Sequence, residues 1–158
     1  MAYQQVWSEQ LVLRVDERSL RGFAKLRQAA GDVRVFVPYT RSELTRAALS
    51  HAAALTRNLS ARITLFAVHL VPYPLPLDRP DVPAAFLERK LGSVARASGA
   101  QADIRIGFAR DPNIGLEQIL PQHSLIVIAT KRRWWPTPEV KLARTLARAG
   151  HSVALVGV

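Results

Sequence analysis

Short apolar runs that alternate with amphipathic stretches constrain the fold of this chain more than any other feature. Continuous apolar runs at residues 33–38, 63–71 and 125–129 are typical of strands buried on both faces of a sheet. Two further strands are predicted at 104–108, where polar and apolar residues alternate, and at 153–156. Helical patterns separate these strands, so we predict a parallel sheet with right-handed crossovers and helices on both faces, a three-layer α/β/α sandwich. The expected helices cover residues 42–59, 86–98, 112–121 and 138–149.

Residue types with known capping roles mark the ends of the predicted helices. Asp111-Pro112 and Thr137-Pro138 each supply a side-chain cap followed by proline at the first helical position. Thr40 and Glu43 have the spacing of a capping box before the first helix. Gly150 is expected to end the last helix.

The chain is divided into an N-terminal extension, residues 1–31, and a domain, residues 32–158. Leu11, Leu13 and Val15 alternate with other residues as in a strand, and a helix is expected to follow it. Half of the ten prolines lie between residues 72 and 83, which predicts an extended loop. We interpret this loop as a stiff connector, with a lid over the strand ends as the alternative.

Several functional classes are excluded or disfavoured by composition. The chain has no cysteine, which excludes disulfides and thiolate metal sites. It has no apolar run long enough to span a membrane and no signal-peptide pattern, so we expect a cytoplasmic protein. The four histidines have no partner at metal-ligand spacing, and the Gly-x-Ser-x-Gly motif is absent. We therefore predict no metal site and no catalytic set, and expect that the chain is not an enzyme.

Ligands in sheets of this type bind beyond the carboxyl ends of the strands, where the strand order reverses. The net charge of +10 favours an anionic partner, and residues 131–148 carry six basic residues and one acidic residue. Lys131 to Trp135 could form an anion site, or the two tryptophans could cover the end of the sheet. The candidate ligand-binding residues are Pro38, Tyr39, Thr40, Val68, Ala129, Thr130, Lys131, Arg132 and Arg133.

From residue 32 onward, the chain resembles the universal stress protein (UspA-like) family. Residues 37–43 are similar to the family's Val-Pro-x-Asp-x-Ser-Glu, residues 61–66 resemble its second strand, and residues 125–131 are similar to Leu-Ile-Val-Met-Gly-Ser-Arg. The resemblance implies an adenine nucleotide alpha hydrolase-like fold with a five-stranded parallel sheet of order 3-2-1-4-5. It also implies a homodimer and, in one branch of the family, an ATP site.

The ATP-binding branch uses the motif Gly-x2-Gly-x9-Gly-Ser/Thr after its fourth strand, because the backbone must approach the phosphates closely. The same spacing here falls on Ala129, Arg132, Leu142 and Ala143, and Thr40 replaces the family's aspartate. We therefore expect a divergent member that lacks the family's ATP mode and needs no cofactor.

Three functions are left open by the sequence. The preferred one is a non-catalytic, universal-stress-protein-like module with a stress-response or regulatory role, which dimerises and has at most a weak anion pocket. The second is a protein that binds ATP, AMP or a related nucleotide through an Arg/Lys-based phosphate site. The third is nucleic-acid binding through the basic face of the last helix, which carries Lys141, Arg144 and Arg148.

The last strand is the expected dimer interface, since an uncovered apolar edge invites pairing. Its residues are Val153, Ala154, Leu155 and Val156. Residues 1–31 could instead cover this edge. By analogy of fold alone, the chain could also be the soluble domain of a transporter.

Overall fold

A computed structural model describes residues 12–14 and 33–158 of the chain. The strands are β1 (Val12–Arg14), β2 (Val33–Pro38), β3 (Ala61–Leu70), β4 (Ala102–Ala109), β5 (Leu125–Thr130) and β6 (Ser152–Gly157). The helices are α3 (Ser42–Thr56), α4 (Ala84–Ser98), α5 (Pro112–Ile119) and α6 (Pro138–Arg148). The predicted alternation of strands and helices from residue 33 onward is confirmed.

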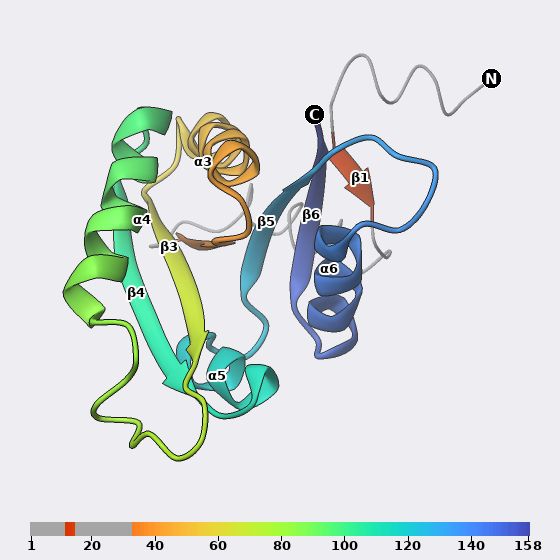
Figure 1. Ribbon diagram of the computed structural model, residues 1–158. Helices are drawn as coiled ribbons and strands as arrows, with labels where there is room; N and C mark the ends of the chain where they lie inside the picture. The colour runs from red at the N-terminus through yellow and green to blue at the C-terminus, as the bar shows by residue number, and fades with distance from the viewer. Residues whose placement is uncertain (1–11, 15–32) are drawn as a thin grey trace.

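The strands form one sheet in the order β1-β6-β5-β2-β3-β4 (Figure 1). Strands β2 to β6 are mutually parallel, and their spatial order is the expected 3-2-1-4-5. The order reverses at β2, which pairs with β3 on one side and with β5 on the other. The topological switch point therefore lies between the carboxyl ends of β2 and β5.

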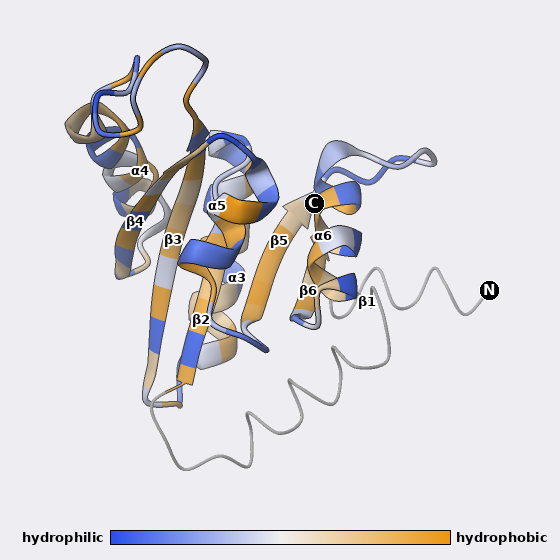
Figure 2. Cartoon of the chain, turned by 90° about the horizontal axis from the view of Figure 1, so that it is seen from below, coloured by the Kyte–Doolittle hydropathy of each residue, from blue (hydrophilic) through white to orange (hydrophobic). Residues whose placement is uncertain are grey.

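Two apolar clusters on opposite faces of the sheet make the fold three-layered. Alternate residues of each central strand belong to different clusters, because successive side chains of a strand point to opposite faces. Val35 and Val37 pack with α3 and α4, whereas Phe36 packs with the cluster that contains residues of α6. Figure 2 shows the central strands as the most apolar part of the chain. Among the described helices, none is long and apolar enough to cross a bilayer.

The N-terminal caps of α5 and α6 are the predicted residues, whereas the cap of α3 differs from the prediction. Asp111 accepts hydrogen bonds from the backbone N–H groups of Asn113 and Ile114, and Thr137 caps α6 as expected. The capping box predicted before α3 is wrong. The N-cap residue is Arg41, one position later than the box requires, and it makes no side-chain cap. The Thr40 N–H donates instead to the Thr45 hydroxyl, 3.1 Å away.

Strand β1 covers part of the outer edge of β6. It runs antiparallel to β6, with Val12 opposite Val156 and Arg14 opposite Ala154. The predicted N-terminal strand is thus confirmed in its central residues, while the helix expected after it lies outside the described residues. The four β6 residues expected at a dimer interface, residues 153–156, are at most 4% exposed in the single chain. A dimer that pairs two β6 edges would require β1 to leave this position.

The proline-rich loop after β3 is tethered at both of its ends. The Arg110 guanidinium donates to the carbonyls of Val71 and Leu75 and lies 4.1 Å from the centre of the Tyr73 ring. Near the other end of the loop, Asp81 lies 2.9 Å from His69 Nε2. These contacts hold both ends of the loop against the body, while the side chains of Tyr73, Leu75 and Leu77 within it are exposed.

Candidate functional site

The switch point brings together the first turn of α3 and the segment that follows β5. Two ion pairs join these segments: Lys131 Nζ lies 3.2 Å from Glu43 Oε2, and Arg41 Nε lies 3.7 Å from Glu139 Oε1. Each pair links the β2–α3 side of the crevice to the β5–α6 side. The crevice where a ligand would bind is therefore bridged by the chain's own charged side chains.

Glu139 is the unusual member of this group, because its side chain is only 6% exposed whereas that of Arg41 is 63% exposed. It is the second residue of α6, in the first turn. A negative charge is favourable there, because the unpaired N–H groups and the helix dipole make a helix N-terminus positive. This is also where a phosphate group would bind in a site of this class. The buried carboxylate opposes a second anion at the same place.

Two threonines fasten the start of α6 to the end of β5. The hydroxyls of Thr130 and Thr137 lie 2.7 Å apart and are buried. The Thr137 oxygen also accepts a hydrogen bond from the Val140 N–H at 3.3 Å, which caps the helix. Thr130 was a predicted ligand-binding residue. Its hydroxyl is engaged within the fold, and the residue is only 2% exposed.

The remaining candidate residues are not all in one place. Pro38 ends β2 and is buried, and the Tyr39 hydroxyl lies 3.2 Å from the Ser42 hydroxyl. Lys90 from α4 lies 5.1 Å above the Tyr39 ring. Tyr39 packs with the cluster under α3 and α4, whereas Val68 packs against the opposite cluster. The sheet thus separates Val68 from Tyr39.

The positions that match the family's glycine spacing lie in different environments. Ala129 is buried within β5, and Arg132 is exposed in the loop after it. Leu142 and Ala143 are the fifth and sixth residues of α6, and Ala143 is fully buried in the core. These last two residues therefore do not reach the helix N-terminus, where a phosphate cradle would be needed.

The loop after β5, residues 131–136, extends away from the body of the molecule (Figures 1 and 2). Trp134 is 93% exposed and Trp135 is 57% exposed, and their ring centres are 6.3 Å apart. The prediction that these rings cover the end of the sheet is wrong. Lys131, Arg132 and Arg133 are exposed, and the Arg132 N–H donates to the carbonyl of the C-terminal residue.

Among the four histidines, His123 and His151 lie close enough to interact electrostatically. His51 has a buried Nε2 atom without a hydrogen-bond partner, and burial lowers its pKa below the usual value. Burial, and more weakly the charge of His123, also lowers the pKa of His151, whose Nδ1 accepts a hydrogen bond from the Ser124 N–H. The hydrogen bond to His69 lowers the pKa of the exposed Asp81 carboxyl. Within residues 12–14 and 33–158, no three His, Asp or Glu side chains are grouped as metal ligands.

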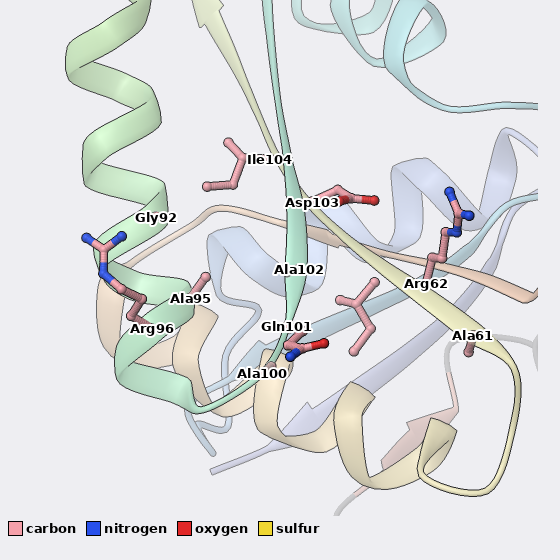
Figure 3. A pocket seen from close by; sticks show the side chains of 11 residues that line it. Ala61, Arg62, Gly92, Ala95, Arg96, Ala100, Gln101, Ala102, Asp103 and Ile104 are labelled. Atoms are coloured by element: carbon pink, nitrogen blue, oxygen red, sulfur yellow. The ribbon is translucent and has the colours of Figure 1, made fainter.

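Two surface hollows lie along β4, away from the switch point. The first, about 570 Å³, lies between the C-terminal part of α4 and the beginnings of β3 and β4 (Figure 3). Its charged residues do not converge, because Arg96 extends away from the strands while Asp103 and Arg62 lie on the other side of β4. The second hollow, about 630 Å³, lies between the proline-rich loop, β4 and α5.

Sequence reasoning missed the two charged residues that decide the character of the switch point, Arg41 and Glu139. The available signal was an acidic residue directly after a Thr-Pro helix start, a place where carboxylates are favoured. Comparisons with known proteins found no matching family model and no matching curated protein. The observed geometry is therefore the basis for the proposals that follow.

Proposed function

We propose that this chain is a non-catalytic, universal-stress-protein-like module with a regulatory role, whose switch point is closed to nucleotides by its own ion pairs. The observation that carries the proposal is the buried Glu139 carboxylate in the first turn of α6, paired with Arg41. An ATP triphosphate at this place would have to displace or face that carboxylate. The side chains at the crevice thus replace the glycines of the ATP-binding branch with internal contacts.

The second ion pair supports the same conclusion. Lys131 is the first cation after β5, and it points to Glu43 across the crevice. Since both members are substantially exposed, this pair contributes only about 0–1 kcal/mol to stability. Its importance is geometric: a lysine that could hold a phosphate is directed to a carboxylate instead.

Titration calorimetry with ATP, AMP and a cyclic dinucleotide tests this proposal. We expect no binding heat from the native chain. Neutralising both carboxylates in Glu43→Gln/Glu139→Gln releases Arg41 and Lys131 from their ion pairs at the crevice, so this variant is expected to gain measurable ATP affinity. The matched control is Glu88→Gln/Glu117→Gln, which removes the same charge from exposed positions on α4 and α5. Micromolar binding of ATP to the native chain would contradict the proposal.

A nucleotide-binding protein with an Arg/Lys-based phosphate site is the second candidate. Its support is the group of exposed cations at the end of β5, Lys131 to Arg133. In that case the native chain binds a nucleotide with micromolar affinity, and Arg132→Ala abolishes the binding. If Arg132→Ala has no effect on an observed affinity, the basic loop is not the phosphate site.

Self-association is the remaining part of this proposal. The resemblance to universal stress proteins implies a homodimer, but β1 pairs with the β6 edge expected at the interface. Light scattering of the full chain and of a variant that lacks residues 1–14 tests the two arrangements. A dimer that forms only after the deletion would mean that β1 covers a self-associating edge. A monomeric deletion variant would rule out dimerisation through β6.

A further inference from the structure

The most anomalous surface of the molecule is the loop of residues 131–136, which we name the tryptophan loop. It projects from the body between β5 and α6 (Figure 1), and it carries two exposed, adjacent indoles. At 93% exposure, Trp134 has almost no contact with the rest of the chain. Large apolar side chains exposed in this way are typical of surfaces that meet an apolar partner.

Basic residues precede and follow the two indoles along the chain, with no exposed acidic residue among positions 131–148, while the exposed Glu43 of α3 pairs with Lys131. Lys131, Arg132 and Arg133 precede the indoles, and a face of α6 continues the charge with basic residues at i, i+3 and i+7. The three residues of that face are Lys141, Arg144 and Arg148, all exposed. Glu139 is the one acidic residue between positions 131 and 148, and it is buried against Arg41.

The cations beyond the switch point remain available to an outside partner. Arg133, Lys141, Arg144 and Arg148 form no ion pair with any of the described residues. The tryptophan loop and this face of α6 together supply two exposed indoles and four exposed cations. A partner that fits both must offer a dense negative surface and an apolar layer directly behind it.

We propose that the tryptophan loop docks on an anionic lipid bilayer, with Trp134 and Trp135 in the headgroup region and the basic residues against the lipid charges. Indoles concentrate at the membrane–water interface because the ring is apolar and its N–H remains hydrated. Each basic residue near an anionic membrane strengthens partition by about fivefold, so charge alone gives reversible, salt-sensitive binding. Two indoles supply the second, apolar component that firm attachment needs.

The shape of the patch favours a bilayer over a nucleic acid. Single-stranded nucleic acids are bound in a positively charged groove where successive bases stack on aromatic rings. Here both rings are exposed on a projecting loop, and their planes are tilted by 54°. A projecting loop with exposed rings enters a lipid headgroup layer without any rearrangement.

Vesicle co-sedimentation with the full chain tests this proposal. Vesicles of phosphatidylcholine alone are compared with vesicles containing phosphatidylserine, at low and high salt. We expect binding to the anionic vesicles, a loss of binding with salt, and a blue shift of tryptophan emission. The emission is measured in a Trp7→Phe background, because the chain has three tryptophans and only two belong to the loop.

Two pairs of variants assign the binding to the patch. Trp134→Ser/Trp135→Ser removes exposed rings and is expected to reduce partition at least about tenfold without changing thermal unfolding. Arg133→Ala/Lys141→Ala should reduce it by about 25-fold, as two cations at about fivefold each. Arg57→Ala/Arg89→Ala, which removes the same charge from exposed sites elsewhere, should have a much smaller effect.

The outcomes distinguish membrane docking from nucleic-acid binding, and they are independent of the proposal that the switch point is closed to nucleotides. Failure of the native chain to bind anionic vesicles would overturn the membrane proposal. Vesicle binding that is unchanged in both the tryptophan variant and the Arg133→Ala/Lys141→Ala variant would also overturn it. Binding to a single-stranded oligonucleotide that depends on Trp134 and Trp135, without vesicle binding, would assign the patch to nucleic acid instead. Because nucleotide binding and vesicle binding are measured independently, the two proposals can fail separately.

Discussion

Replacing Thr137 by valine tests how the start of α6 is held at the switch point. Valine keeps the shape of threonine and removes the hydroxyl that caps the helix and contacts Thr130. Loss of an N-cap costs about 1 kcal/mol. The buried Thr130 hydroxyl loses its 2.7 Å partner and keeps only a long, 3.4 Å hydrogen bond to the Lys131 carbonyl, which adds about 1–3 kcal/mol. We therefore expect a loss of about 2–4 kcal/mol in the free energy of unfolding.

Urea denaturation followed by circular dichroism measures this loss. Thr137→Ser is the matched control, because serine retains the hydroxyl and should preserve most of the stability. The double variant Thr130→Val/Thr137→Val removes both hydroxyls, so no buried hydroxyl is left without its partner, although the Val140 N–H still loses its cap. It should be more stable than the sum of the two single variants predicts, with a coupling of about 1–2 kcal/mol. The reasoning is refuted if Thr137→Val has the same urea midpoint as the native chain. It is also refuted if the losses in free energy of unfolding of the two single variants add up to that of the double variant.

Two further predictions concern the pH dependence of stability and the packing of a buried glycine. Because the pKa values of His51 and His151 are lowered in the fold, the unfolded chain binds more protons than the folded chain below about pH 6.5. The urea midpoint of unfolding should therefore decrease when the pH is lowered from about 7.5 to about 5.5. The variant His51→Leu should show a smaller decrease. A midpoint that does not change over this range would contradict the burial of these rings. A Cβ at Gly115 would overlap a methyl group of Val68, so Gly115→Ala should cost about 1–3 kcal/mol. Gly92→Ala, where a helical Cβ meets only ordinary contacts, should instead be neutral or stabilising by up to about 1 kcal/mol, and equal effects at the two sites would be inconsistent with this packing.

The fold was predictable because its determinants are local in the sequence. The buried strands are continuous apolar runs, and strand β2 has the predicted bounds, residues 33–38. The caps at Asp111 and Thr137 were also predictable, since each side chain bonds to a backbone group within three residues. The failed box at Thr40 shows the limit of such patterns. The α3 helix begins at Ser42 as expected, but its N-cap is Arg41, and the Thr40 N–H donates to the Thr45 hydroxyl instead.

The character of the candidate site was less predictable, because it depends on residues far apart in the sequence. Glutamate is usually exposed, and the burial of Glu139 depends on its pairing with Arg41, which is distant in the sequence. The exposure of Trp134 likewise could not be deduced from its neighbours, since two tryptophans after a strand could equally have covered the sheet. Pairing of β1 with β6 joins segments far apart in the sequence, and the sequence offered cover of this edge by residues 1–31 only as an alternative to dimerisation.

A crystal structure grown with excess ATP tests the closed switch point most directly. The account predicts that the Arg41–Glu139 and Lys131–Glu43 pairs remain intact and that no triphosphate lies between β2 and β5. The contradictory result is a triphosphate bound to the backbone N–H groups at the start of α6, with Arg41 turned from Glu139 toward the phosphates.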